Sequence, residues 1–372
     1  MIVGVPKEIK NEERRVGMTP GSVRELTSRG HSVLVEGSAG LGSGYPDSAY
    51  ADVGAKVVDG PDTVFAEAEL IVKVKEPQAP ERARLREGQT LFTYLHLAPD
   101  PDQARDLLAS GATCIAYETV LGRDGGLPLL APMSKVAGRM SIQAGAHCLE
   151  APQGGSGILL GGVPGVAPAK VTVIGGGVVG TNAIEMAVGL GADVAILDRS
   201  VDVLDRLARR FGPALRTVYS TQAALDEWVL GADLVIGAVL VPGAAAPRLV
   251  TEEMVKGMKS GSVLVDVAID QGGCFQTSHA TTHAEPTYMV HDVVHYCVAN
   301  MPGAVPHTST EALNDVTLPY VIALADQGVV DALNSVPGFL GGLNTHKGML
   351  TEEAAADALG LEFVAEADAL SR

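Results

Sequence analysis

The sequence is poor in basic residues, and this shortage limits the partners that the chain can have. Its 372 residues include 27 lysines and arginines against 44 aspartates and glutamates, which gives a net charge of -17. Such an excess of negative charge repels phosphate backbones and anionic lipid headgroups. We therefore expect neither nucleic acid nor a membrane as a partner.

Cysteine is scarce as well, and its spacing bears on the compartment. The four cysteines include no Cys-x-x-Cys pair and no spacing typical of a disulfide framework. Unpaired cysteines of this kind suit a reducing environment. We expect a cytoplasmic protein.

The chain also lacks the apolar segments that export or membrane insertion requires. The amino terminus becomes strongly charged soon after Val5, which is the wrong order for a secretory signal. The most apolar region, 157–180, is interrupted by Pro164, Pro168, Lys170 and many glycines. No transmembrane segment is expected.

What the sequence does have is enough apolar content for two large cores. Hydrophobic residues make up 47% of the chain and charged residues 19%, so a disordered chain is not expected. A chain of this length normally divides into two domains. Glycine and proline concentrate over 151–169 and again over 301–306, which marks two candidate boundaries.

Short apolar runs alternate with helical patterns along most of the chain. Thr19, Pro20 and Gly30 delimit a first helix over 21–28, whose core-facing residues would be Val23 and Leu26. Strands are expected over 2–5, 32–35, 70–74, 90–95, 113–117, 171–174, 193–197, 233–236 and 263–267, and helical patterns dominate after 306. The alternation predicts an α/β fold with two Rossmann-like, doubly wound parallel-sheet domains and a cleft between them.

A glycine motif follows one of the predicted strands. Gly175, Gly177 and Gly180 form a Gly-x-Gly-x-x-Gly pattern between the strand over 171–174 and a helical stretch over 181–190. The first glycine would make the tight turn, the second would admit a pyrophosphate, and the third would let helix and sheet pack closely. Asp198, which follows the next predicted strand, would meet the ribose hydroxyls of the cofactor.

This motif predicts dinucleotide binding, with NAD as the cofactor. The Asp198 carboxylate would repel the 2'-phosphate of NADP, although Arg199 beside it weakens that inference. The alternative interpretation is a tight loop without a ligand and a solvated aspartate at a strand end.

Charged residues at other strand ends are the candidates for chemistry, because open α/β sheets bind ligands beyond the carboxyl ends of their strands. Lys75 closes one predicted strand, His96 and Asp270 follow two others, and Arg15 lies in the loop after the first strand. Two cations to hold a carboxylate and two groups to handle protons are what amino-acid oxidation needs. Each residue alone could instead be an ordinary surface charge, a capped strand end or the start of a turn.

Four histidines, His279, His283, His291 and His295, lie close together in the sequence, and the last two have the spacing of metal ligands on a helix. No His-Glu-x-x-His motif, cysteine pair or acidic cluster accompanies them. We expect no metal.

Several motifs, in order along essentially the whole chain, resemble the alanine dehydrogenase family, which also includes the NAD-binding subunits of transhydrogenases. They are Val5-Pro-Lys-Glu8, Asn11-Glu-Glu-Arg-Arg-Val-Gly-Met-Thr-Pro20, Lys73-Val-Lys-Glu-Pro77, Phe92-Thr-Tyr-Leu-His-Leu97, Ala131-Pro-Met-Ser-Lys-Val-Ala-Gly-Arg-Met140, Gly237-Ala-Val-Leu-Val-Pro-Gly243, Asp266-Val-Ala-Ile-Asp-Gln-Gly-Gly-Cys274 and Val298-Ala-Asn-Met-Pro302.

The resemblance implies reversible oxidation of L-alanine to pyruvate and ammonia with NAD. It implies a discontinuous substrate domain, 1–130 plus 305–372, an inserted NAD-binding domain, 131–304, and a homohexamer. Arg15 and Lys75 would bind the substrate, and His96 and Asp270 would move protons, with their division of labour open. The implied cofactor contacts are Ser134, Gly175, Gly177, Val178, Val179, Gly180, Asp198, Ser220, Val239, Leu240, Ala268, Ile269, Asp270, Val298, Ala299, Asn300 and Met301.

The sequence allows three other interpretations. The chain could be the NAD-binding component of a transhydrogenase, which would not reduce NAD in response to an amino acid. It could be a dehydrogenase of another amino acid, as in the related lysine-pathway enzymes, since pocket volume is not visible in a sequence. It could also be a non-catalytic NAD sensor.

Overall fold

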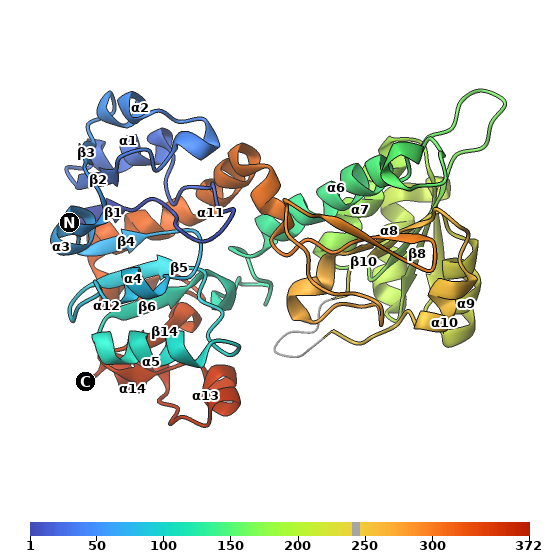
Figure 1. Ribbon diagram of the computed structural model, residues 1–372. Helices are drawn as coiled ribbons and strands as arrows, with labels where there is room; N and C mark the ends of the chain where they lie inside the picture. The colour runs from blue at the N-terminus through green and yellow to red at the C-terminus, as the bar shows by residue number, and fades with distance from the viewer. Residues whose placement is uncertain (240–245) are drawn as a thin grey trace. The chain divides into compact units, whose positions relative to one another are not determined.

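The computed structural model describes residues 1–239 and 246–372, and its contacts divide the chain into two compact units. The first unit comprises 1–133 and 305–372, and the second comprises 134–304. Both termini of the chain belong to the first unit (Figure 1). Within the described residues, no helix has the length and apolar character needed to cross a membrane.

The first unit is built around an eight-stranded sheet in the order β15-β14-β6-β5-β4-β1-β2-β3. Its strands are β1 (Ile2–Val5), β2 (Ser32–Glu36), β3 (Lys56–Val58), β4 (Leu70–Val72), β5 (Thr90–Thr93), β6 (Thr113–Ala116), β14 (Leu343–His346) and β15 (Met349–Leu350). The strands from β1 to β6 are parallel, and β14 and β15 pair in antiparallel fashion. The order reverses at β1, as in a doubly wound sheet.

Helices connect these strands and extend the unit at its carboxyl end. They are α1 (Pro20–Ser28), α2 (Asp47–Ala51), α3 (Pro61–Glu67), α4 (Ala79–Arg82), α5 (Pro101–Ser110), α11 (Pro306–Gln327), α12 (Val329–Ser335), α13 (Glu353–Leu359) and α14 (Glu366–Leu370). Helix α6 (Ala131–Cys148) begins in this unit and continues into the second.

The start of α1 illustrates how local sequence sets an element. The Thr19 hydroxyl accepts the Ser22 N–H at 3.2 Å, and Pro20 occupies the first turn, where its missing N–H costs nothing. Val23 and Leu26 are fully buried, and Gly30 has a φ of 86° just after the helix. The predicted helix and its delimiting residues are confirmed.

The second unit contains a seven-stranded sheet in the order β12-β13-β11-β10-β7-β8-β9. Its strands are β7 (Lys170–Ile174), β8 (Asp193–Asp198), β9 (Leu215–Tyr219), β10 (Leu234–Gly237), β11 (Val263–Asp266), β12 (Thr287–Val290) and β13 (Val293–Tyr296). All are parallel except β12, which forms an antiparallel hairpin with β13. The helices are α7 (Val178–Gly189), α8 (Val201–Phe211), α9 (Gln222–Gly231) and α10 (Glu252–Gly257).

This sheet reverses its order at β7, so the loops that follow β7 and β10 lie side by side at its carboxyl edge. Leu225 and Val229 of α9 and Met254 and Val255 of α10 pack into one core cluster on the sheet. The prediction of two α/β domains with doubly wound, mainly parallel sheets is confirmed.

The carboxyl end contains two strands that the sequence did not predict. Helical patterns do dominate after 306, but β14 and β15 interrupt them and extend the sheet of the first unit beyond β6. Phe339, which is fully buried, packs against Phe92 of β5 with ring centroids 5.7 Å apart. The pairing of β14 depends on the distant strand β6, which no local pattern shows.

Candidate functional site

The first unit gathers polar side chains at one edge of its sheet. Arg15 lies in the loop after β1, Lys75 follows β4, and His96 follows β5. Because β1, β4 and β5 are neighbouring parallel strands, their carboxyl ends meet at the same edge. Lys75 and His96 therefore lie at adjacent strand ends, and Arg15 lies in the loop that follows the neighbouring strand β1.

Arg15 is buried, with only 2% of its surface exposed, and its guanidinium is held by several contacts. Its Nε and Nη2 donate to the two carboxylate oxygens of Glu13 at 2.7 and 2.5 Å, and its Nη1 lies 3.0 Å from the sulfur of Met133. Burial alone would lower the pKa of Arg15, but the hydrogen bonds and the charge of Glu13 raise the pKa above its ordinary value. A permanent cation with a fixed orientation results, which suits a carboxylate ligand.

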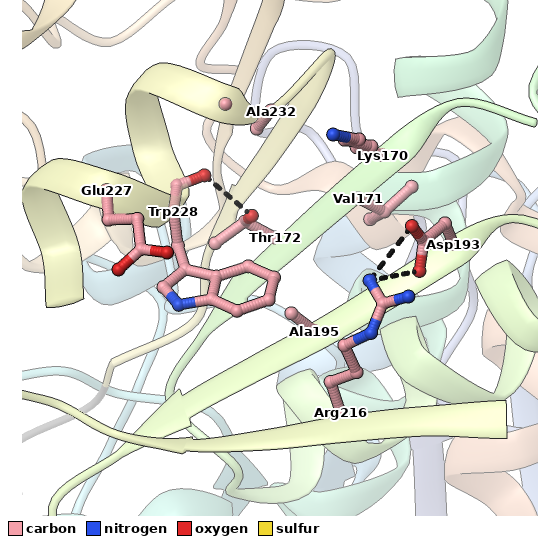
Figure 2. A pocket seen from close by; sticks show the side chains of 10 residues that line it. Lys170, Val171, Thr172, Asp193, Ala195, Arg216, Glu227, Trp228 and Ala232 are labelled. Atoms are coloured by element: carbon pink, nitrogen blue, oxygen red, sulfur yellow. Dashed lines mark hydrogen bonds and ion pairs between the residues drawn. The ribbon is translucent and has the colours of Figure 1, made fainter. Parts of the chain in front are cut away.

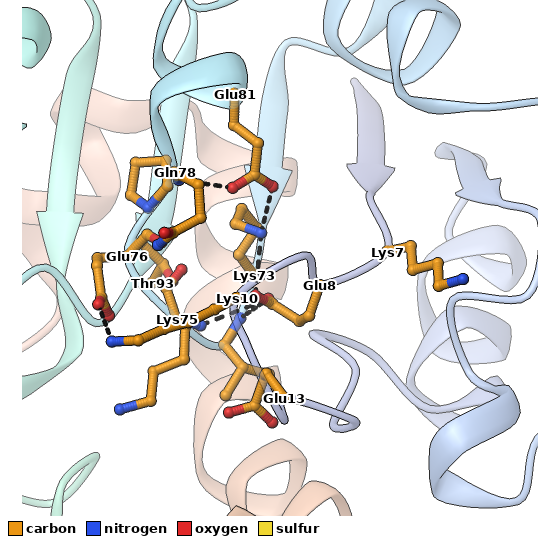
Figure 3. Close-up of polar contacts among 12 residues, drawn as sticks. Lys7, Glu8, Lys10, Glu13, Lys73, Lys75, Glu76, Gln78, Glu81 and Thr93 are labelled. Carbon is orange, nitrogen blue, oxygen red and sulfur yellow. Dashed lines mark hydrogen bonds and ion pairs between the residues drawn. The ribbon is translucent and has the colours of Figure 1, made fainter. Parts of the chain in front are cut away.

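Lys75 emerges from a buried charged cluster at the end of β4. Lys73, two residues earlier, is fully buried and donates to Glu8 at 3.1 Å and to Glu81 of α4 at 2.6 Å (Figure 3). The other oxygen of Glu8 accepts the N–H of Val74 at 2.7 Å. Lys75 itself is half-buried. The cluster fixes the backbone from which the Lys75 side chain projects.

His96 lies in a turn with an unusual backbone. Its φ is 50°, in the left-handed region that few non-glycine residues occupy. The side chain is 45% exposed, its ring is parallel to that of Tyr94 at 5.8 Å, and Nδ1 lies 3.5 Å from Oε1 of Glu118. Tyr94 is buried, which raises the pKa of its hydroxyl, and it donates to the Leu129 carbonyl at 2.7 Å. The imidazole is thus accessible to a ligand, while Tyr94, whose ring is parallel to it, is held in place by its hydrogen bond.

Sequence reasoning missed the carboxylates that support these residues, namely Glu8, Glu13 and Glu118. Glu118 lies in the 3-10 turn over Tyr117–Thr119 directly after β6, so the strand-end criterion that selected His96 would have found it too. Burial raises the pKa of Glu8, and the positive charge of Lys73 opposes this increase. No local signal distinguishes Glu8 or Glu13 from surface acids.

The glycine motif in the second unit forms the turn from β7 into α7. Gly175 has a φ of 98°, and a Cβ there would lie 2.7 Å from the Ala238 carbonyl oxygen. A Cβ on Gly180 would lie 1.8 Å from the Gly175 carbonyl oxygen, so helix and strand approach too closely for any side chain. Around Gly177, by contrast, nothing lies within 4 Å of a Cβ position. The chain itself therefore gives no steric reason for glycine at 177, and an approaching ligand would supply one.

Asp198 ends β8 beside this turn. Its two carboxylate oxygens accept the N–H groups of Gly176 at 2.7 Å and of Ser200 at 2.8 Å. A carboxylate offers about four acceptor positions, so both oxygens can still accept hydroxyl groups. Asp198 therefore fixes the glycine turn and remains able to bind a ribose.

Asp270 lies in the 3-10 turn Val267–Gln271 that follows β11, and it is exposed. Buried Asp266 anchors the segment after this turn, because its Oδ2 accepts the Cys274 N–H at 2.8 Å and the Ser278 hydroxyl at 2.6 Å. Burial raises the pKa of Asp266. Asp270 belongs to the second unit and His96 to the first.

The other proposed cofactor residues of the second unit lie mainly at or near its strand ends and turns. Ser220 follows β9 and donates its N–H to the Asp198 carbonyl at 3.0 Å. Asn300 has a φ of 64°, a strained conformation of the kind that clusters at functional sites. The remaining ones are Ser134 in α6, Val178 and Val179 at the start of α7, Val239 after β10, Ala268 and Ile269 after β11, and Val298, Ala299 and Met301 after β13. Leu240 lies outside the described residues.

The histidine-rich segment does not have helical geometry. His291 lies in the turn between β12 and β13, where it contacts Glu252, and His295 lies in β13. His295 is buried and bonds to the Thr277 hydroxyl at 2.7 Å. Across residues 1–239 and 246–372, no group of three or more potential ligands is placed to hold a metal.

A cavity of about 310 Å³ lies elsewhere in the second unit, near the amino ends of β7 and β8 (Figure 2). Its polar groups largely pair with one another: Arg216 with Asp193 at 2.8 Å, and the Thr172 hydroxyl with the Trp228 carbonyl at 3.0 Å. None of the residues singled out from the sequence lines it. We therefore place the candidate substrate and cofactor residues at the carboxyl edges of the two sheets and not in this cavity.

Comparisons with known proteins cover the whole chain. Residues 4–137 match the family model for the alanine dehydrogenase/PNT N-terminal domain, and residues 141–353 match the model for the C-terminal domain. An alanine dehydrogenase of Halomonas elongata is 62% identical over 364 residues, which make up 98% of this chain and 98% of that protein.

Solved structures give the same result. A chain described as L-alanine dehydrogenase matches with a TM-score of 0.94 at 52% identity, over 97% of this chain and 99% of that one. A transhydrogenase from Sinorhizobium meliloti matches with a TM-score of 0.83 at only 26% identity, over 94% of this chain and 100% of that one.

Proposed function

Since the chain belongs to the alanine dehydrogenase/PNT family, we propose that it catalyses the NAD-dependent oxidation of L-alanine to pyruvate and ammonia, and the reverse amination. The observation that carries this proposal is the placement of Arg15, Lys75 and His96 along one edge of one sheet. Two cations and an accessible imidazole match the carboxylate and the proton transfers of an amino acid being oxidised.

The second unit fits a dinucleotide. The open space at Gly177 admits a pyrophosphate at the start of α7, where the N–H groups and the helix dipole favour negative charge. Asp198 fits the ribose hydroxyls and disfavours the extra phosphate of NADP. When bound, NAD would accept the hydride from the substrate Cα.

Arg15 and Lys75 would bind the substrate carboxylate and carbonyl region and so orient the Cα hydrogen for transfer. Such orientation can lower a barrier by several kcal/mol, on the order of 7–11 in favourable intramolecular cases. Because Arg15 is buried against Glu13, its orientation is fixed before the substrate binds.

Once the substrate ammonium has released a proton, loss of hydride from the Cα leaves a cationic imine. Water adds to the imine carbon, and His96 or Asp270 takes the proton that the water releases. The same groups then return a proton to the carbinolamine nitrogen and accept the proton of its hydroxyl, so that ammonia leaves as the carbonyl of pyruvate forms. Water and L-alanine thus supply all atoms of pyruvate and ammonia.

We assign substrate binding to 1–130 plus 305–372 and NAD binding to 131–304, and we propose that the protein is a cytoplasmic homohexamer. The family resemblance supports these assignments. Light scattering of the purified protein would test the hexamer.

The test of function is NADH formation by the purified chain with NAD and L-alanine, run beside L-lysine, glycine, L-serine and a reaction without substrate. We expect turnover with L-alanine well above all others. Preference for L-lysine would indicate another substrate, and tight NADH binding without turnover would favour a transhydrogenase-like module or a sensor.

A further inference from the structure

Three carboxylates with little exposure hold the backbone of the three proposed substrate-site residues in the first unit. Glu13 accepts the N–H of Arg15 at 3.0 Å, and Glu8 accepts that of Lys75 at 3.4 Å. Glu118 accepts the N–H of His96 at 2.5 Å. The same arrangement therefore recurs three times along one edge of the sheet: Glu8 and Glu13 come from the loop after β1, and Glu118 comes from the turn after β6.

The contact of Glu118 with the turn that bears His96 is the closest of the three. Its Oε1 accepts the N–H groups of both Leu95 and His96, at 3.0 and 2.5 Å. The Glu118 side chain is 13% exposed, so water competes poorly for these donors. Two consecutive N–H groups therefore donate to one carboxylate oxygen.

His96 needs this support because its backbone is strained. A φ of 50° costs a residue other than glycine roughly 1–2 kcal/mol relative to right-handed or extended backbone. The imidazole itself is 45% exposed, so side-chain packing alone does not fix it. The separation of 3.5 Å between Nδ1 and Glu118 is long for a hydrogen bond, so the backbone contacts are the stronger link.

We propose that Glu118 is a positioning residue, whose carboxylate holds the turn over 95–96 in its strained conformation and thereby aims the His96 imidazole at the reacting substrate. The inference rests on the proposed function, because it concerns the efficiency of proton transfer by His96. A displacement of about 1 Å at such a group can cost on the order of 10²-fold in rate.

Two variants of Glu118 separate this role from others. Glu118→Gln retains an oxygen that can accept both N–H groups, whereas Glu118→Ala retains none. We expect kcat with L-alanine to fall on the order of 10²-fold in Glu118→Ala and by less than about threefold in Glu118→Gln. NADH affinity should stay unchanged in both, and KM for L-alanine should change much less than kcat.

The matched control is Glu352→Ala in the same unit. The Glu352 carboxylate accepts the Ala355 N–H at the start of α13, so its loss removes a comparable backbone contact elsewhere. We expect Glu352→Ala to lower the melting temperature with kcat intact. A kcat of Glu118→Ala equal to that of the wild type, or a Glu118→Gln variant as slow as Glu118→Ala, would overturn the proposal.

Amide hydrogen exchange tests the same contacts without any turnover. In Glu118→Ala, the peptide containing Leu95 and His96 should exchange faster than in the wild type, and the peptide over α5 should not change. Unchanged exchange at Leu95 and His96 would refute the positioning role. A wild-type protein that shows this protection but does not oxidise L-alanine would instead refute the proposed function.

Discussion

At the scale of single residues, the glycines of the β7–α7 turn serve different requirements. Gly175 and Gly180 are needed by the fold, because side chains there would collide with backbone oxygens. Gly177 meets no such limit and has a φ of -68°, which any residue adopts. The motif predicted all three positions from the sequence, but only the structure separates the folding glycines from the ligand glycine.

This separation predicts opposite behaviour of two alanine variants. Gly177→Ala should keep the melting temperature of the wild type and weaken NADH binding at least about tenfold, since the methyl group occupies space that the pyrophosphate needs. Gly180→Ala should instead destabilise the protein by about 1–3 kcal/mol or more. Fluorescence titration with NADH and thermal unfolding measure the two effects.

Gly189→Ala, in the last turn of α7, is the control. No atom lies within 4 Å of its Cβ position, and it lies far along the helix from the turn. Gly189→Ala should leave the affinity for NADH unchanged and should not lower the melting temperature. Equal NADH affinity in Gly177→Ala and the wild type would contradict the assigned pyrophosphate position.

Buried His295 predicts a loss of stability in acid. Burial lowers its pKa below the ordinary 6.5, which the Val293 carbonyl partly opposes, and it bonds to the Thr277 hydroxyl while uncharged. The unfolded chain therefore takes up a proton at a higher pH than the folded chain does. The contribution of uncharged His295 to stability is complete above pH 6.5 and is lost as the pH falls below that value.

Urea unfolding at about pH 8 and about pH 5.5 measures this effect. We expect the free energy of unfolding to fall less between the two conditions in His295→Gln than in the wild type. His346, whose pKa is also lowered by burial, leaves a residual dependence in both proteins. Equal losses in variant and wild type would show that His295 does not contribute.

At the scale of elements, two strands end earlier than the sequence predicts. Apolar runs predict strands over 70–74 and 90–95, but β4 ends at Val72 and β5 at Thr93. The N–H of Val74 goes to Glu8 and that of Leu95 goes to Glu118, so neither N–H continues the ladder. Apolar periodicity could not reveal this, because both acceptors come from other parts of the chain.

Lys73 joins three elements through one buried charge. It lies after β4 and pairs with Glu8 from the loop after β1 and with Glu81 of α4. Lys73→Met would leave two buried carboxylates without a cation, and we expect a loss of about 3–5 kcal/mol in the free energy of unfolding. Urea denaturation at neutral pH is the measurement.

Lys56→Met is the matched control in the same unit. Lys56 is 65% exposed and lies 3.9 Å from Glu67, so its ion pair is screened by water. Lys56→Met should show no resolvable change in the free energy of unfolding. A Lys73→Met protein as stable as Lys56→Met would mean that Glu8 and Glu81 are protonated or hydrated at little cost.

At the scale of the whole molecule, the carboxyl-terminal segment completes the first unit, since β14 pairs with β6 and α11 to α14 belong to that unit. The second unit is therefore an insertion in the chain of the first. The cleft that the sequence predicts between the two domains stays a prediction.

Ligand binding should stabilise the molecule by mass action. NADH at about 100 times its dissociation constant should add roughly 2.7 kcal/mol to the stability of the state that binds it, and so raise the melting temperature. The same NADH concentration should raise the melting temperature of Gly177→Ala much less. An equal shift in both proteins would place NADH away from the β7–α7 turn.

The sequence by itself determined the fold class, the glycine turn with Asp198, and the strand-end positions of Arg15, Lys75 and His96. These features follow from local periodicity, from steric limits on glycine and from the order of elements along the chain. Only the tertiary structure decided the rest: that β14 pairs with β6, that Lys73 is neutralised by Glu8 and Glu81, and that Glu118 holds the turn of His96. Each of these depends on a partner distant in the sequence, and burial, not local pattern, makes that partner necessary.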